Sequence, residues 1–338
     1  MTWPGDGANP AGWSRRRGRG ERGEQSMVPR AQFSSYYGRP VLKEPVWRSP
    51  EVPGYFFLGG LAGASSVLAA FCEVTGNREL SRAAKITAGG AIGLSTAALI
   101  SDLGRPERFL NMLRVFKPTS PMSVGSWLLT TYGSAAAAAA ACTVTGWVPK
   151  VGALATAGAA LVGPGVATYT AVLLSDTSIP AWHEGYREMP YLFAGSAASA
   201  AGGMGMLAVP TARSGPAARL AVIGAATEIA AKHLLTRRLG PNAEPYHSGR
   251  SGAFMRTAEI LAAAGLAGAV LARRNRWLAA ASGAALLSAS ALTRFGVFEA
   301  GRASAKDPKY TVVPQRERLN GKSEAGQPGR TEPVSPAR

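Results

Sequence analysis

Residues 118–149 read PTSPMSVGSWLLTTYGSAAAAAAACTVTGWVP and contain no charged side chain. About 20 apolar residues are enough for a helix to cross the roughly 30 Å of hydrocarbon in a bilayer. A helix in the core of a soluble protein would instead show a polar face to water. The stretch therefore predicts a membrane-spanning helix, and it sets the fold class as an all-α integral membrane protein.

Similar segments, almost free of charge, lie on both sides of this one. Together they predict about eight transmembrane helices, at residues 55–75, 83–101, 122–148, 151–175, 191–209, 217–235, 253–272 and 277–300. Three of these hold edge charges or many Ala and Gly residues, so a count of seven stays open. Helices in lipid associate through small residues. The runs that begin at Gly59 and Gly202 are therefore interpreted as packing positions rather than phosphate loops.

The two ends of the chain differ from the part between them. Lys and Arg outnumber Asp and Glu by 37 to 20, and five arginines stand between Arg15 and Arg22 among Gly, Pro and Ser. This predicts a disordered basic tail over residues 1–50 without a signal-peptide core, a membrane domain over 51–300, and a polar tail over 301–338. A basic tail can coat nucleic acid, but beside eight spans a topology determinant is the preferred interpretation and no nucleic-acid partner is expected.

The distribution of basic residues also predicts an orientation in the cell membrane. An even number of spans puts both termini on one side. The loops on the two sides carry nearly equal numbers of Lys and Arg, so the residues that flank the outer spans decide, among them Lys43, Arg48 and Arg302. Because cytoplasmic flanks are enriched in Lys and Arg, both termini are expected in the cytoplasm.

Two acidic residues at span ends need an explanation. The segment SDLGRPERF at residues 101–109 follows the second span, and SDTSIP at 175–180 repeats its Ser-Asp-x-x-x-Pro pattern two spans later, on the same membrane face. A carboxylate in the interface is costly unless it is paired, and Arg105 or Arg108 is the expected partner of Asp102. Asp102 is thus either a loop clamp or part of a proton-coupled site. His183, which follows Asp176, is either a polar interface group or a proton-handling residue.

These segments resemble the NrfD/polysulfide reductase membrane-subunit family. The resemblance rests on DLGRPER at 102–108, SPMSVGSW at 120–127, YTAVLL at 169–174, PAW at 180–182 and LFAGS at 192–196. The ending RFGVFEAG at 294–301, followed by Asp307-Pro308, looks like the close of actinobacterial members. The resemblance covers roughly residues 53–314 and leaves out the basic N-terminal tail.

The resemblance implies eight spans in two four-helix bundles and a place in anaerobic respiration. The chain would be a membrane anchor that exchanges electrons between the menaquinone pool and a four-cluster ferredoxin-like iron–sulfur subunit, which serves a molybdopterin catalytic subunit. It would carry out no substrate chemistry of its own.

The residues agree with a subunit that binds quinone without haem or metal. A haem needs axial ligands inside the spans, and the only histidines are His183, His233 and His247. His247 falls in a loop and His233 has no opposing histidine, so a bis-histidine haem is excluded. Cys72 and Cys142 are too few for an iron–sulfur cluster or a disulfide framework. Electrons are therefore expected to pass directly between a bound quinone and the cluster of a partner.

A quinone needs a flat apolar slot with a donor or acid for each carbonyl oxygen. The predicted site combines two proton-handling groups with four residues that bind or wall the cofactor. The proton-handling groups are Asp102 and His183, and the others are Arg105, which would tune Asp102, Trp127, Tyr169 and Asp176.

Charges inside the later spans keep other functions open. Glu228 and Lys232 stand four residues apart and are expected to pair on one helix face, while Glu259 lies in the seventh span. Charged groups within a membrane are functional candidates, so a proton route is the alternative to simple pairing. The rival functions are an ion- or solute-translocating protein and a purely structural anchor.

Overall fold

The structure is a computed structural model, and it describes residues 42–105, 107–272 and 275–312. Most of the two predicted tails lies outside the described residues. Within them the chain is helical and has no strand. The eight long helices are α1 (Glu51–Val74), α2 (Arg78–Asp102), α4 (Pro121–Thr145), α5 (Pro149–Ser175), α7 (Met189–Ala208), α8 (Gly215–Leu239), α10 (Gly249–Leu271) and α11 (Arg276–Lys306). The predicted all-α membrane fold is confirmed.

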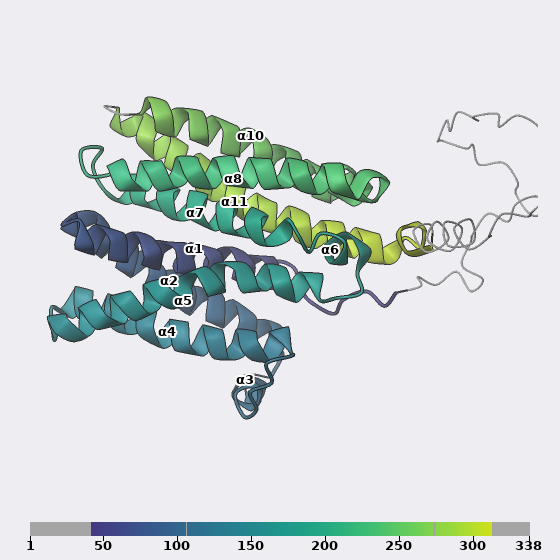
Figure 1. Cartoon of the computed structure of the whole chain (residues 1–338), viewed down its shortest axis with the longest axis horizontal. Helices are drawn as coiled ribbons and strands as arrows, with labels where there is room; N and C mark the ends of the chain where they lie inside the picture. Colours follow the sequence, from purple (N-terminus) through teal and green to yellow (C-terminus); the bar gives the residue numbers. More distant parts are fainter. Residues whose placement is uncertain (1–41, 106, 273–274, 313–338) are drawn as a thin grey trace, which may run out of the picture. The chain divides into compact units, whose positions relative to one another are not determined.

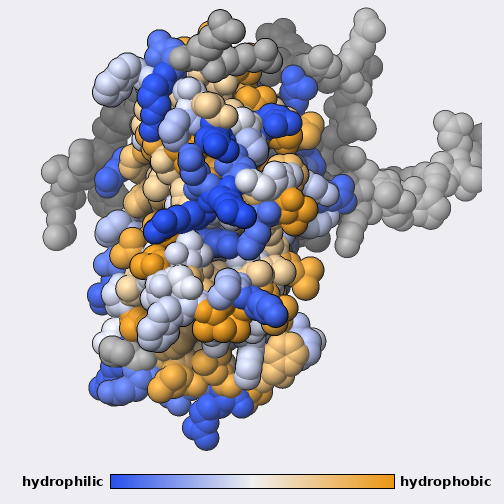
Figure 2. All heavy atoms as spheres, turned by 90° about the vertical axis from the view of Figure 1, so that its left-hand side faces the viewer, coloured by the Kyte–Doolittle hydropathy of each residue, from blue (hydrophilic) through white to orange (hydrophobic). Residues whose placement is uncertain are grey.

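The eight long helices form two four-helix bundles (Figure 1). The first bundle contains α1, α2, α4 and α5, and the second contains α7, α8, α10 and α11. The bundles meet mainly where α1 and α5 contact α7 and where α1 contacts α11. Short helices fill the connections at one end: α3 (Glu107–Met112), α6 (Pro180–His183), the 3-10 turn η1 (Gly240–Ala243) and α9 (Glu244–His247). The opposite end, seen face-on in Figure 2, shows a concentration of hydrophilic side chains.

Six of the long helices are apolar enough to cross a membrane by length and composition alone. The other two, α7 and α8, are 20 and 25 residues long. Glycine and serine dilute the apolar character of α7, and α8 carries Glu228 and Lys232. These two charged residues in the middle of α8 are buried in the second bundle, where protein groups rather than lipid surround them. Hydropathy alone therefore supports six spans. The assignment of α7 and α8 as spans depends on their packing in the second bundle.

Local sequence sets where the helices begin and end. The Ser120 side chain accepts a hydrogen bond from the backbone N–H of Ser123, and Pro121 occupies the first turn of α4. Asn275 caps α11 in the same way, because its side-chain oxygen accepts from the N–H groups of Trp277 and Leu278. Gly146 ends α4 with a φ of 73°, a left-handed conformation that glycine adopts without strain.

Glycines let α7 and α8 approach closely. A Cβ atom added at Gly202 would lie 2.4 Å from the backbone nitrogen of Ala221, and one added at Gly224 would lie 2.3 Å from that of Ser199. These distances leave no room for a side chain. The contact agrees with the interpretation of the Gly202 run as a packing motif, and it fixes the position of the charged face of α8.

We expect Gly202→Ala to lower the thermal unfolding midpoint of the purified protein in detergent. The added methyl group must push α8 away, and overpacking of this kind costs about 1–3 kcal/mol. Gly93→Ala in α2 is the control, because a Cβ there meets open space and alanine favours the helix by up to about 1 kcal/mol. Equal midpoints for the two variants would show that the α7–α8 contact is not tight.

Candidate functional site

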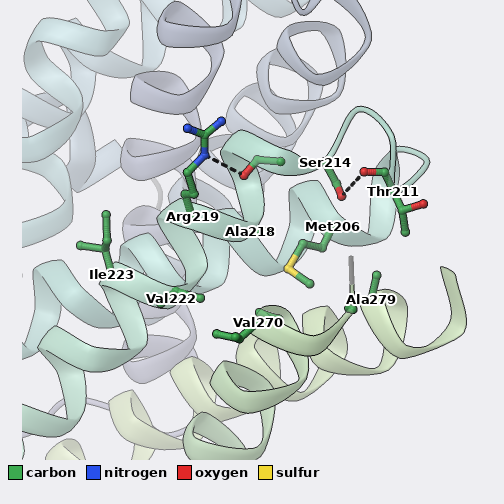
Figure 3. A pocket seen from close by; sticks show the side chains of 12 residues that line it. Met206, Thr211, Ser214, Ala218, Arg219, Val222, Ile223, Val270 and Ala279 are labelled. Carbon is green, nitrogen blue, oxygen red and sulfur yellow. Dashed lines mark hydrogen bonds between the residues drawn. The ribbon is translucent and has the colours of Figure 1, made fainter. Parts of the chain in front are cut away.

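An apolar pocket of about 250 Å³ lies in the first bundle, at the end where α2 finishes and α4 begins. It is lined by Trp47, Val52, Tyr55, Phe56, Leu99, Asp102, Leu103, Met112, Met122, Gly125, Ser126, Leu129, Tyr169 and Leu173. A larger groove of about 590 Å³ lies in the second bundle (Figure 3), but no acidic or aromatic residue lines it. The smaller pocket combines aromatic walls with a carboxylate, so it is the better candidate for redox chemistry.

The aromatic wall of the pocket depends on a glycine in α4. A Cβ added at Gly125 would lie 2.5 Å from the ring of Tyr169, so only glycine lets that ring lie against α4. The Tyr169 ring meets the ring of Tyr55 edge to face, with 6.5 Å between the ring centroids. Phe56, one residue further along α1, adds a third aromatic ring to the lining. These side chains give the pocket the flat, apolar surface that an aromatic ligand needs.

Residues 42–50, which we call the strap, cross the mouth of the pocket before α1 begins. Trp47 stacks on the buried ring of Trp182 with 5.7 Å between centroids. The backbone N–H of Arg48 donates a hydrogen bond to Oδ1 of Asp102 at 3.0 Å. The strap thus contacts the end of α2 on one side and α6 on the other, so it covers the pocket at the aqueous side.

Glu44 connects the strap to the end of α11 through ion pairs. Its carboxylate lies 2.7 Å from a guanidinium nitrogen of Arg302 and 3.3 Å from the ammonium of Lys306. Burial alone would raise the pKa of Glu44, but the hydrogen bonds and positive charges of Arg302 and Lys306 hold it below its usual range. The carboxylate is therefore ionised at neutral pH, and the strap joins both bundles at this end.

Asp102 is half-buried at the pocket mouth, and the strap is its partner. Its hydrogen bond goes to the backbone of Arg48. The expected ion pair with Arg105 is not formed, and the side chain of Arg108 lies outside the described part of the chain. A neutral backbone donor therefore orients the carboxylate.

The structure brings two of the six predicted site residues together and leaves four outside the pocket. Asp102 and Tyr169 both line it. Trp127 is 37% exposed on the outside of α4, where it meets the ring of Phe116 edge-on. Arg105 and Asp176 are exposed in connections. His183 is exposed too, and its Nδ1 lies 3.0 Å from the carbonyl oxygen of Ser175.

Three aromatic residues of the lining were not anticipated: Trp47, Tyr55 and Phe56. Trp47 falls in the stretch assigned to a basic tail on composition. A signal was nevertheless present, because WRSPEVPGYFF at residues 47–57 places aromatic residues directly before and inside the first span. Aromatic residues in such positions mark the membrane interface, and here they form part of the pocket.

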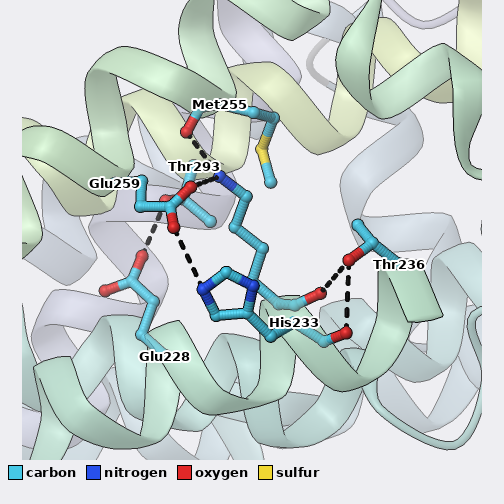
Figure 4. A network of polar contacts seen from close by, with 7 residues as sticks. Glu228, His233, Thr236, Met255, Glu259 and Thr293 are labelled. Carbon is cyan, nitrogen blue, oxygen red and sulfur yellow. Dashed lines mark hydrogen bonds and ion pairs between the residues drawn. The ribbon is translucent and has the colours of Figure 1, made fainter.

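A second polar cluster lies in the middle of the second bundle (Figure 4). Nζ of Lys232 lies 2.5 Å from Oε2 of Glu259 and 2.8 Å from the carbonyl oxygen of Met255. Nε2 of His233 lies 3.1 Å from the other oxygen of Glu259. The expected pair of Glu228 with Lys232 is therefore wrong. The cause is the neighbouring helix α10, which brings Glu259 beside Lys232.

Glu228 is 4% exposed, and hydroxyl groups surround it. It accepts hydrogen bonds from Thr293 at 2.6 Å and from Ser199 at 3.2 Å. Close by, Arg294 is fully buried and donates to the carbonyl oxygen of Phe193 at 2.7 Å. Its guanidinium carbon lies 3.7 Å from the centroid of the Phe193 ring. Among the described residues, Nε and Nη1 of Arg294 have no hydrogen-bond partner.

No group of three or more His, Cys, Asp or Glu residues that could hold a metal ion is found in the described part of the chain. Cys72 and Cys142 are both free thiols, on different helices.

Comparison with known proteins identifies the family. Residues 41–238, more than half of the chain, match the family described as polysulphide reductase, NrfD. The chain belongs to the NrfD family. NrfD proteins are membrane subunits of quinone-interacting oxidoreductase complexes, and the match includes the strap and both aromatic walls of the pocket. Helices α10 and α11 lie beyond the matched residues. No curated protein matches the chain.

We expect Gly125→Ala to weaken quinone binding by about tenfold or more. The new methyl group would force the Tyr169 ring toward the pocket, and a repacking cost above about 1.4 kcal/mol corresponds to a factor of ten in affinity. Gly133→Ala in the same helix is the matched control, because its nearest neighbour would be at an ordinary 3.8 Å. Titration of a water-soluble quinone, followed by tryptophan fluorescence, measures both. Equal affinities would place the quinone elsewhere.

Proposed function

We propose that this NrfD protein is the quinone-reactive anchor of a molybdopterin oxidoreductase complex, passing electrons between menaquinone and a four-cluster ferredoxin-like iron–sulfur subunit. One observation carries the proposal: an aromatic-walled pocket in the first bundle holds a carboxylate at its mouth and a phenol in its wall. A quinone presents a flat ring with two carbonyl oxygens, so the residues fit its shape and its chemistry.

The residues of the pocket have separable roles in this proposal. A bound quinone exchanges two electrons and two protons when it interconverts with quinol. Asp102 holds or releases a proton at its carboxylate. Tyr169 offers a phenolic hydroxyl as hydrogen-bond donor. Trp47 and the rest of the strap limit water at the aqueous mouth, so protons arrive by way of Asp102.

The end of the protein near Asp102 is the proposed docking face. Electrons must pass from the quinone to a cluster in the partner, and this end is the nearest aqueous surface to the pocket. The connection around α3 presents exposed basic residues there, including Arg105, Arg114 and Lys117. Acidic groups on the partner would complement them. The strap and the end of α11 belong to this side, and we propose that it is cytoplasmic because of the basic residues that flank the outer helices.

Asp102→Asn tests the proton role. Asparagine keeps an oxygen that can accept from Arg48, so the strap should stay in place while the acid is lost. We expect normal assembly, quinone-linked turnover reduced about 100-fold, and unchanged activity with an artificial electron carrier that acts at the catalytic subunit. Asp176→Asn should leave both activities unchanged, since Asp176 lies outside the pocket.

Two outcomes would count against this role for Asp102. Full quinone turnover in an assembled Asp102→Asn complex would show that another group supplies the proton. Loss of both activities together, with a lower yield of complex, would make Asp102 a structural clamp of the strap.

Proton translocation is a second candidate, and the polar cluster of the second bundle favours it. Glu228 is a buried carboxylate in the middle of α8, and a small cavity beside it is also lined by Lys232 and Glu259. His233, which contacts Glu259, has a side chain that is 56% exposed. In this second proposal, protons enter at His233 and Glu259 and bind reversibly to the Glu228 carboxylate.

Glu228→Gln separates proton movement from electron transfer. Glutamine can accept from the Thr293 hydroxyl through its oxygen and donate to the Ser199 hydroxyl through its amide nitrogen, but it cannot bind and release a proton. In proteoliposomes containing the complex and a pH-sensitive dye, we expect quinone turnover to persist while proton movement per electron falls to the background level. Glu73→Gln, an exposed carboxylate in the first bundle, is the control. Unchanged proton movement in Glu228→Gln would remove this second candidate.

A further inference from the structure

The groove of the second bundle lies between α8 and α10, at the end opposite the Asp102 pocket (Figures 1 and 3). Ala218 and Val222 of α8 form one side, and Ala269 and Val270 of α10 form the other. The buried side chain of Met206 forms part of the lining. Small side chains on both helices leave a volume of about 590 Å³ unfilled.

The groove opens onto the surface of the bundle that faces lipid. Ile223 and Val270 line it and are 65% and 52% exposed. No acidic residue lines it. A trench with apolar walls and no carboxylate suits a hydrocarbon chain, and in a membrane-spanning bundle hydrocarbon chains are the apolar molecules that surround it.

One end of the groove is positively charged. Arg219 lines the groove and is exposed, and its Nε makes a long contact of 3.4 Å with the carbonyl oxygen of Gly215, four residues earlier in α8. No ion pair of Arg219 is found within the described residues. The hydroxyl-bearing residues Thr211 and Ser214 lie at the same end (Figure 3). The buried Ser214 hydroxyl donates to the carbonyl oxygen of Thr211 at 3.2 Å. This end therefore offers a cation and the Thr211 hydroxyl to an anion.

A second arginine adds positive charge at this end of the bundle. Arg276, at the start of α11, donates hydrogen bonds to the carbonyl oxygens of Met206 and Val209 at the end of α7. No carboxylate pairs with it among the described residues, and the partial negative charge at the end of α7 offsets only part of its charge. The neighbouring Trp277 is 84% exposed, as is typical of a tryptophan at the level of the lipid headgroups.

The order of the charged end and the apolar trench along α8 matches the order of headgroups and hydrocarbon in a bilayer. Arg219 lies in the second turn of α8, and Ile223 follows one turn deeper, which is about 6 Å along the helix. The cation is thus near the end of the helix, and the trench continues toward the middle of the bundle. A free phosphate would use only the arginine, and an uncharged lipid would use only the trench.

We propose that this groove binds an anionic phospholipid, with its headgroup phosphate at Arg219 and one acyl chain along Met206, Val222 and Val270. The lipid fills the gap between α8 and α10, which contact each other further along, where Lys232 pairs with Glu259. The groove is then a binding site of its own, separate from the quinone pocket of the first bundle.

The test compares lipid binding by the purified, delipidated full chain in detergent. Phosphatidylglycerol is the anionic probe and phosphatidylcholine the zwitterionic one, and binding is measured by native mass spectrometry and by the thermal unfolding midpoint. We expect one phosphatidylglycerol to bind with preference and to raise the midpoint. Arg219→Gln should weaken phosphatidylglycerol binding about tenfold and leave phosphatidylcholine binding unchanged. Lys150→Gln, an exposed cation on the same side in the first bundle, should change neither.

A second variant tests the trench rather than the charge. Ala218→Phe should fill the groove and reduce binding of both lipids. If that variant does not fold, Arg219→Gln decides alone, because Arg219 is exposed and makes no ion pair that folding requires. Equal lipid preference in the wild type and Arg219→Gln would overturn the proposal. So would inorganic phosphate that raises the midpoint as much as phosphatidylglycerol does, since that would identify a free-anion site.

Discussion

Close backbone approach between helices is the constraint on which the rest of this structure depends. Lipid gives helices no hydrophobic reason to associate, so they must be held by packing. A Cβ added at Gly63 of α1 would lie 2.3 Å from the carbonyl oxygen of Gly163 in α5, and the α7–α8 contact at Gly224 is equally tight. Helices that touch at glycines diverge elsewhere. The Asp102 pocket and the groove beside Arg219 both lie where neighbouring helices are further apart than at these glycine contacts.

The strap turns one of these spaces into a site. Without it, the pocket between α1, α2 and α4 would open directly to water at the end of α2. Trp47 covers the opening by stacking on Trp182, and Glu44 holds the strap to the end of α11 through Arg302. The same segment supplies the hydrogen bond that orients Asp102. A short extended segment therefore provides both the closure and the orientation of the acid, and it links the two bundles while doing so.

The position of a residue along its helix could be predicted from the sequence, but the rotation of each helix about its own axis could not. Hydropathy predicted the eight long helices. The position of Asp102 at the end of a span predicted the end of the bundle at which the pocket lies. Trp127 was expected to wall the quinone site, but α4 is rotated so that its ring lies on the outside and Gly125 faces Tyr169. The pairing of Lys232 failed for a related reason. Spacing along α8 favours Glu228, and only the position of α10 reveals that Glu259 is closer.

The interface between the bundles connects the two polar regions. Arg294 lies against α1, since a Cβ added at Gly60 would be 3.1 Å from its Nη2. Its guanidinium covers the ring of Phe193, and that ring contacts Phe56 with 6.3 Å between centroids. Phe56 in turn lines the Asp102 pocket. A buried cation thus stands two aromatic rings away from the pocket and close to Glu228. The electrostatic energy of a buried charge depends strongly on nearby charges. A change of charge in the pocket would therefore alter the electrostatic potential at Glu228 through Arg294, without a continuous chain of water between them.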